Sequence, residues 1–301
     1  MPEETHHNAK LPSANSGGSA VEPDSSGDTA LVLLGHGSTV NSASADPVYR
    51  HATALRERGI FGQVLEGFWK QEPSLAGVLR GVWTKRAVVV PLFTTEGYFT
   101  QTVLPRELGF PMLADGGGYA SRMINKSREV FYAQPVGTHP RMAEVLERRA
   151  AQIVSERPFP FAPKPADTSL VLVGHGTSRD RNSRRTLESH AAVIRARSGF
   201  SEVLAMFMEE PPLIAEVYLV AQRRNVVVVP FFVSDGLHAY EDIPVLLGET
   251  EALVRDRMAR GLEVWRNPTE RHGKRVWLAS SLGSEMWISE VILQRAHEAL
   301  A

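Results

Sequence analysis

Short apolar runs alternate with longer, helix-compatible stretches along the first half of the chain. The strand-like runs occupy 31–34, 61–69, 87–93 and 130–133. The helix-compatible stretches occupy 47–58, 74–83 and 141–154. The run at 87–93 is unbroken and rich in β-branched residues, which is typical of a strand buried on both faces. Strands separated by helices predict a doubly wound α/β fold with a parallel sheet.

The second half of the chain repeats this order of elements. Its strand-like runs occupy 170–173, 202–208, 226–233 and 276–279. Its helix-compatible stretches occupy 183–197, 211–222 and 284–300. The predicted fold class is therefore α/β, with two tandem doubly wound domains that each hold a parallel β-sheet flanked by helices.

Three short motifs recur in the two halves at nearly the same separation. The motif pairs are 31–38 with 170–177, 88–93 with 227–232, and 72–75 with 210–213. The first two pairs are offset by 139 residues, since 170 − 31 = 139 and 227 − 88 = 139, and the Glu-Pro pair by 138, since 210 − 72 = 138. Motifs in nearly constant register indicate an internal repeat.

The repeat and the composition of its flanks divide the chain into four segments. Residues 1–28 are rich in Ser, Gly, Pro and Asp, which is typical of a disordered tail. We expect the N-terminal repeat at 29–157, a stiff Pro-rich linker at 158–167, and the C-terminal repeat at 168–301.

Composition removes several classes of function. Lys and Arg number 33 against 34 Asp and Glu, a balance that favours neither nucleic acid nor an acidic membrane as partner. The chain has no cysteine, which excludes thiolate metal sites and iron–sulfur clusters and leaves His and carboxylates as ligands. No apolar run resembles a signal peptide or approaches a membrane span, so a cytoplasmic location is expected. The sequence has no P-loop, Gly-x-Ser-x-Gly elbow or dinucleotide fingerprint, so no nucleotide is expected.

Three polar side chains follow three different strands of the second half. His175 lies between two glycines after the first strand, Glu209 ends the second, and His238 follows the third. Taken singly, each residue has a simpler explanation. His175 could be a turn residue, Glu209 could mark the point where a strand ends in water, and His238 could be a histidine of a surface loop. Together they meet at the carboxyl edge of a doubly wound sheet, where ligands bind. Two imidazoles and a carboxylate suit Zn, Fe, Co or Ni, so we predict a metal site with catalytic residues His175, Glu209 and His238.

The first half preserves little of this ligand set. His36 matches His175, whereas the position matched to Glu209 holds Gln71, and 238 − 139 = 99 is Phe99. We therefore predict that the first repeat carries a degenerate site, of which His36 is the remnant.

A cluster of arginines follows the Gly-His-Gly turn of the second half. Its members are Arg179, Arg181, Arg184 and Arg185. Such a cluster is either the solvated start of a helix or a clamp for a ligand with several carboxylates, because Arg binds carboxylates through two parallel hydrogen bonds. We take the four arginines as candidate substrate-binding residues. Tyr240 could add flat apolar contact to a macrocycle, as could Tyr98 and Phe99.

These residues resemble those of the class II tetrapyrrole chelatases, and in particular the two-repeat sirohydrochlorin cobaltochelatases and ferrochelatases. The resemblance rests on Gly174-His-Gly-Thr177, on Phe207-Met-Glu209 followed by Glu210-Pro211, and on Gly236-Leu-His-Ala-Tyr-Glu-Asp-Ile-Pro244. It covers roughly 29–301. This chain places Glu209 directly before Glu210, where the family usually spaces its two carboxylates further apart, so either carboxylate could be the ligand.

The resemblance implies two α/β domains that face each other across a cleft holding the macrocycle. It implies a lyase that inserts Co²⁺ or Fe²⁺ into sirohydrochlorin without ATP, in cobalamin or sirohaem biosynthesis, with His175, Glu209 and His238 as the metal-binding residues. The ligand set could also accept Ni²⁺ or Zn²⁺. We expect a monomer that acts as an internal pseudo-dimer, or a weak homodimer. The alternatives are a non-catalytic metal or tetrapyrrole carrier on the same fold and a metal-dependent hydrolase.

Overall fold

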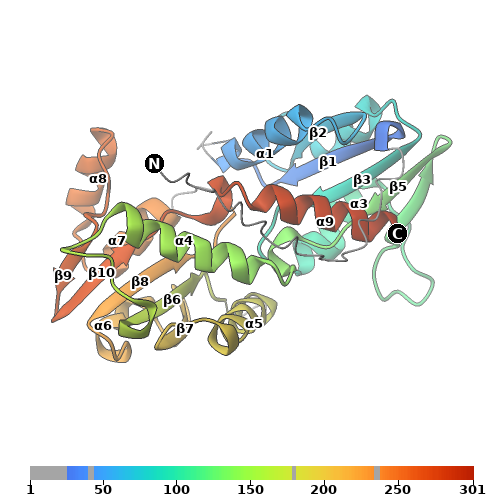
Figure 1. The fold of residues 1–301 in the computed structure, drawn as a ribbon. Helices are drawn as coiled ribbons and strands as arrows, with labels where there is room; N and C mark the ends of the chain where they lie inside the picture. The colour runs from blue at the N-terminus through green and yellow to red at the C-terminus, as the bar shows by residue number, and fades with distance from the viewer. Residues whose placement is uncertain (1–25, 40–43, 178–180, 234–237) are drawn as a thin grey trace, which may run out of the picture.

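The chain forms two five-stranded sheets that lie side by side and are joined by helices (Figure 1). This computed structural model describes residues 26–39, 44–177, 181–233 and 238–301. The two sheets have the same strand order, β2-β1-β3-β5-β4 in the first repeat and β7-β6-β8-β10-β9 in the second. The predicted α/β class with two repeated domains is confirmed.

In both sheets four strands run parallel and one edge strand runs antiparallel. The strands of the first sheet are β1 (Thr29–Gly35), β2 (Gln63–Phe68), β3 (Arg86–Pro91), β4 (Arg122–Asn125) and β5 (Arg128–Tyr132). Those of the second are β6 (Thr168–Gly174), β7 (Glu202–Phe207), β8 (Asn225–Pro230), β9 (Thr269–Arg271) and β10 (Lys274–Leu278). Sequence patterning missed the edge strands β4 and β9, because three or four residues are too few to establish a periodicity.

The helices also correspond between the repeats, except that α8 has no counterpart in the described residues of the first repeat. The first repeat holds α1 (Asp46–Glu57), α2 (Leu75–Val78), η3 (Leu79–Gly81), the π-helix η4 (Phe99–Val103), α3 (Leu104–Leu108) and α4 (Met142–Glu156). The second holds α5 (Arg181–Arg197), η7 (Ile214–Glu216), α6 (Val217–Val220), the π-helix η8 (His238–Asp242), α7 (Ile243–Leu246), α8 (Glu251–Ala259) and α9 (Ile288–Leu300). Short 3-10 turns are η1 (Ser26–Asp28), η5 (Val136–Thr138), η6 (Pro165–Asp167) and η9 (Leu282–Ser284).

The central strands are buried on both faces, as their unbroken apolar runs predict. Along β1, Leu31 and Leu33 belong to a core shared by both repeats, while Ala30, Val32 and Leu34 point into a core of the first repeat alone. Alternate side chains of a strand face opposite sides of the sheet, so one strand contributes to two cores. Burial of such side chains stabilises the fold by about 1.5–3 kcal/mol each.

The last helix of each repeat packs against the sheet of the other repeat. α4 packs against β8 and α5 of the second repeat, and α9 packs against β3 and α1 of the first (Figure 1). The indole Nε1–H of Trp277, in β10, donates to the carbonyl of Arg157 just after α4 at 2.8 Å. The apolar pattern of a helix shows which face is buried but not which sheet buries it, so the sequence did not reveal this exchange.

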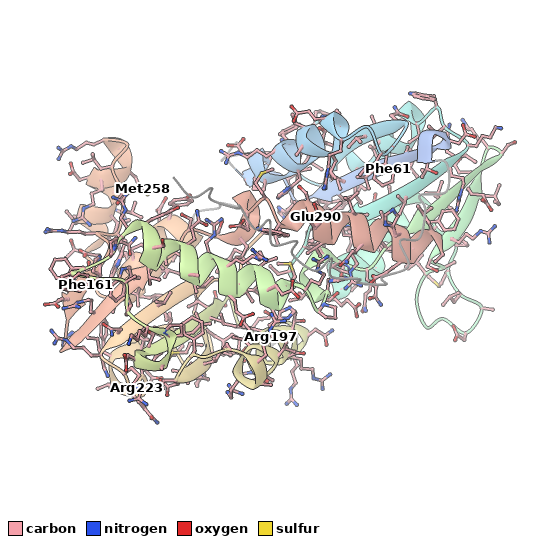
Figure 2. The ribbon with its side chains drawn as sticks, in the orientation of Figure 1. Phe61, Phe161, Arg197, Arg223, Met258 and Glu290 are labelled. Carbon is pink, nitrogen blue, oxygen red and sulfur yellow. The ribbon has the colours of Figure 1, made fainter. Side chains whose placement is uncertain are left out.

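Ion pairs at equivalent positions join the exchanged helices to their new neighbours. Arg58, just after α1, pairs with Glu290 of α9, and Arg197 at the end of α5 pairs with Glu144 of α4. Glu290 lies on α9 and Arg197 at the end of α5, and both side chains are partly exposed (Figure 2). Because both pairs are partly exposed, we attribute most of the stability of the exchange to the shared core.

Candidate metal centre

His175 occupies the first turn after β6, between Gly174 and Gly176. Gly176 has a φ of +74°, and a Cβ on it would lie 2.7 Å from Glu210 Cγ and 2.8 Å from Phe207 Cβ. Only glycine therefore fits this position. The turn brings the His175 Nδ1–H within 3.0 Å of the Gly176 carbonyl, to which it donates. That hydrogen bond fixes the tautomer in which Nε2 carries the lone pair.

Glu209, two residues after β7, lies next to His175. The backbone N–H of Glu209 donates to the His175 carbonyl at 3.1 Å, which ties the two segments together. Glu209 Oε1 is 3.6 Å from His175 Nε2, and the side chains are 61% and 38% exposed. This separation is too long for a strong hydrogen bond, but two ligands at about 2.0–2.2 Å from one ion lie roughly 3–4 Å apart. The pair can therefore share a metal ion that is open to substrate.

The structure separates the neighbouring carboxylates Glu209 and Glu210. Glu210 points beneath the turn, where its Cγ and Oε1 approach Gly176, and its Oε2 pairs with Arg184 at 3.0 Å. Its side chain is only 18% exposed. Of the two carboxylates, Glu209 is the one that faces His175 and solvent, so the geometry favours Glu209 as the ligand.

His238 is the first residue of η8, and its side chain lies outside the described residues. The repeat gives indirect information on this position, because η4 of the first repeat begins at Phe99 and 238 − 99 = 139. The ring centroid of Phe99 is 5.8 Å from that of His36, the counterpart of His175. A side chain at the first position of this π-helix can therefore approach the histidine of the Gly-His-Gly turn.

The structure corrects one equivalence between the repeats. Phe68 N–H donates to the Pro73 carbonyl and Phe207 N–H to the Pro212 carbonyl, both at 2.9 Å, so the offset stays at 139 through this segment. The match of Glu72-Pro73 to Glu210-Pro211, at an offset of 138, was wrong because the second repeat has two consecutive prolines. Glu209 is thus equivalent to Lys70, and Glu210 to Gln71.

At the matching edge of the first repeat, the remaining histidine, His36, lies next to a cluster of aromatic rings centred on Phe99. Phe99 contacts Trp69 at 5.5 Å and Phe93 at 5.3 Å between ring centroids, besides its contact with His36. Lys70 Nζ lies 5.7 Å from the Trp69 ring centroid and is exposed. At two of the three expected ligand positions the first repeat therefore has an apolar ring and a cation. That this repeat carries a degenerate metal site stays a prediction.

The carboxyl edges of the two sheets lie close together. A Cβ on Gly137 would lie 2.1 Å from the carbonyl oxygen of Thr94, three residues after β3. His190 of α5 donates its Nε2–H to the Gly137 carbonyl at 2.7 Å, and its ring centroid is 5.3 Å from that of Phe231, the residue after β8. A short series of contacts therefore links the end of β3 to the end of β8. Because these ends belong to the carboxyl edges of the two sheets, the two edges are linked as well.

An open cleft of about 360 Å³ borders Glu209. Its charged lining comprises Glu209, Glu241, Asp242, Glu251 and Arg255. Tyr240, one residue before Glu241, borders a different cleft of about 170 Å³ beside Trp265. The structure therefore groups Glu209 with η8 and α8, and it places Tyr240 on another surface hollow.

The candidate arginines differ in their surroundings. Arg184 pairs with Glu210 and with Glu188, at 3.0 and 3.1 Å, and its guanidinium carbon lies 4.4 Å from the Phe207 ring centroid. Arg181 and Arg185 are exposed on the first turns of α5, and Arg179 lies outside the described residues. Arg184 is thus engaged by the protein itself, while Arg181 and Arg185 point to solvent.

The described side chains do not complete a metal site by themselves. Among them, no group of three or more His, Asp and Glu is arranged to hold a metal ion, and the His238 imidazole is not one of them. Across the same part of the chain, none of the helices combines the length and apolar character that crossing a bilayer would need.

Comparison with known proteins identifies the family. The CbiX family profile matches the chain twice, over residues 30–153 and 169–299. A probable sirohydrochlorin cobaltochelatase of Halobacterium salinarum is 39% identical over 279 residues, covering 90% of this chain and 91% of that one. The chain belongs to the CbiX family. The resemblance to the two-repeat sirohydrochlorin chelatases is thereby confirmed.

Other relatives agree with the two-repeat organisation of this CbiX-family chain. A sirohydrochlorin cobaltochelatase of Methanopyrus kandleri is 32% identical over 141 residues, which cover 98% of that protein but 42% of this chain. The Deinococcus radiodurans protein DR2241, described as structurally similar to chelatases, superposes with a TM-score of 0.72 at 31% identity; the match covers 90% of this chain and 55% of that one. SirB of Bacillus subtilis, solved with Fe³⁺, shares the fold at a TM-score of 0.63 and 18% identity, with 91% and 96% covered.

Proposed function

We propose that this CbiX-family protein is a lyase that inserts Co²⁺ or Fe²⁺ into sirohydrochlorin without a nucleotide. The observation that carries the proposal is the pair of His175 Nε2 and Glu209 Oε1, 3.6 Å apart at the carboxyl edge of the second sheet. The cobaltochelatase relative at 39% identity supports the substrate.

The proposed metal ligands are His175, Glu209 and His238. Insertion moves the ion from protein ligands to the macrocycle and removes two pyrrole N–H protons. A neutral imidazole can hold the ion through one lone pair and accept a proton once the ion has left. The carboxylate balances the charge of the ion and can pass a proton to solvent. Ligands of this moderate strength also accept Ni²⁺ or Zn²⁺, so we expect insertion of those ions as well.

The macrocycle would lie over the junction of the two carboxyl edges. Sirohydrochlorin carries several carboxylates, which need cations near the site. Arg181, Arg185 and Lys70 are exposed near these edges and can supply them, and Arg179 remains a candidate. Trp69 and Phe99 offer apolar contact to the flat ring, as does Tyr240 if the substrate reaches its cleft. A single chain brings both edges together, so we propose that a monomer suffices.

The test is an insertion assay with purified protein, sirohydrochlorin and Co²⁺, followed by the change in tetrapyrrole absorbance. We expect the rate to exceed the uncatalysed rate and to be unaffected by ATP. His238→Ala should lower the rate by at least tenfold, and circular dichroism provides the check on folding. Tight binding of both substrates with no acceleration would favour a carrier instead.

A further inference from the structure

We propose that Arg184 and Glu210 form a positioning pair for the metal site. In this proposal, which rests on the proposed ligand role of Glu209, Glu210 holds the Arg184 charge away from Glu209 and anchors the 209–210 segment beneath the His175 turn.

The contacts of Glu210 fix the segment on both sides. Its Oε2 pairs with Arg184 at 3.0 Å, and Arg184 also donates to the carbonyl of Pro211, the next residue. The guanidinium lies over the Phe207 ring at 4.4 Å. On the other side, Glu210 Cγ and Oε1 lie directly below Gly176, the residue after His175. Arg184 and Glu210 thus connect α5, the end of β7 and the His175 turn.

In the first repeat, a neutral side chain takes the place of the Glu210 carboxylate on the same backbone. The position of Glu210 holds Gln71, and a Cβ on Gly37 would lie 2.7 Å from Gln71 Cγ, the same separation as between a Cβ on Gly176 and Glu210 Cγ. Gln71 Oε1 accepts a hydrogen bond from the Ser38 N–H at 3.0 Å.

The partner of Glu210 is also missing from the first repeat. The position of Arg184 holds Ala45, since 184 − 139 = 45, and Ala45 is buried. The carboxylate and the arginine therefore occur together in one repeat and are both absent from the other.

This pattern has a physical reason. Removing one partner of a shielded ion pair leaves an uncompensated charge, whereas replacing both partners together is tolerated much better. An Arg184 released from Glu210 keeps Glu188 as a partner on its own helix, and it has a further carboxylate, that of Glu209, in the residue before Glu210. Pairing with Glu209 would withdraw it from the metal. Only the repeat that keeps the Glu209 ligand needs Glu210 to hold the arginine, and in the other repeat Lys70 replaces Glu209.

The experiment compares Glu210→Gln, Arg184→Ala and the double variant, which recreates the Gln71 and Ala45 arrangement. Glu188→Gln is the matched control, because it removes the other carboxylate of Arg184, 3.1 Å away on the same helix. Isothermal titration with Co²⁺ measures Kd, and thermal unfolding measures Tm. A purely structural role would lower Tm and leave the Kd of the folded protein unchanged.

We expect Glu210→Gln to raise the Co²⁺ Kd by roughly tenfold, as is usual when a partner that orients a metal ligand is lost. The double variant should return to within about threefold of the parent, and Glu188→Gln should match the parent. Unchanged Kd in Glu210→Gln, or a double variant no better than the worse single variant, would overturn the proposal. Should Glu210→Gln fail to fold, the double variant must still bind Co²⁺ more tightly than Arg184→Ala.

A Glu209→Ala variant separates this proposal from the proposed function. If Glu209→Ala weakens Co²⁺ binding and Glu210→Gln does not, only the positioning pair is wrong. If Glu209→Ala binds Co²⁺ as the parent does, the ligand assignment itself is wrong.

Discussion

Lys70 in the first repeat occupies the position that Glu209 occupies in the second. The backbone N–H of each donates to the carbonyl of the histidine in its own Gly-His-Gly turn, at 2.9 Å to His36 and 3.1 Å to His175. The same backbone thus presents a cation on one sheet edge and a carboxylate on the other. A cation cannot bind a metal ion, but it can bind a carboxylate of the tetrapyrrole.

Lys70→Ala should therefore affect the tetrapyrrole and leave the metal unaffected. We expect KM for sirohydrochlorin to rise about three- to tenfold, the effect of losing one exposed charge-assisted contact, with the Co²⁺ Kd unchanged. Lys85→Ala is the control, because Lys85 is exposed at the opposite end of β3. An unchanged KM in Lys70→Ala would remove this side chain from the substrate site.

Two substitutions should give the first repeat a metal site of its own. The double substitution Lys70→Glu and Phe99→His restores the carboxylate and the imidazole beside His36. We expect the parent to bind one Co²⁺ per chain and the double variant to bind two, measured by metal analysis after dialysis. Lys70→Glu alone should stay at one. A double variant that folds and still binds a single ion would show that the repeats differ in more than these ligand positions.

The buried histidine at the crossing of the repeats should make stability depend on pH. His51 of α1 donates its Nε2–H to the Gly283 carbonyl at 2.8 Å and lies 2.9 Å from Ser289 Oγ. Burial lowers the pKa of His51 to about 4, against the opposing effect of the Gly283 hydrogen bond. Burial likewise lowers the pKa of His190 at the equivalent crossing.

The unfolded chain binds a proton on His51 at a higher pH than the folded protein does. The contribution of neutral, buried His51 to the free energy of unfolding is therefore complete above pH about 6.5 and is lost as the pH falls through 4. For His51 the loss amounts to roughly 3 kcal/mol in the free energy of unfolding. Urea unfolding at several pH values should show a shallower decline between pH 6.5 and 4 in His51→Gln than in the parent. Equal slopes in the two proteins would contradict this account.

The sequence was sufficient for the parts of the fold that depend on local pattern. The unbroken run at 87–93 and its copy at 226–233 predicted strands buried on both faces, and the strands that form there, β3 and β8, are buried. The partners of α4 and α9 were not predictable, because the exchange between sheets depends on long-range packing.

At the site, the residue types were predictable but their pairing was not. Strand ends located His175 and Glu209, which the structure brings to 3.6 Å. The choice between Glu209 and Glu210 required the position of Arg184, whose pattern in the sequence predicts either a substrate clamp or the solvated start of a helix. The two consecutive prolines of the second repeat allow the Glu-Pro motifs to be aligned at an offset of 138 or 139. The alignment at 138 concealed that Lys70 is the residue equivalent to Glu209.

The most direct test of the account compares Co²⁺ insertion into sirohydrochlorin by His175→Ala and by His36→Ala at equal metal concentration. Both histidines lie in the same type of turn, so the two substitutions are matched in their effect on the fold. We predict that His175→Ala loses at least 90% of the parent rate, roughly a tenfold or larger drop, and that His36→Ala stays within about threefold of it. If His36→Ala is the more damaging substitution, the working metal site lies in the first repeat or is shared across the cleft between the repeats.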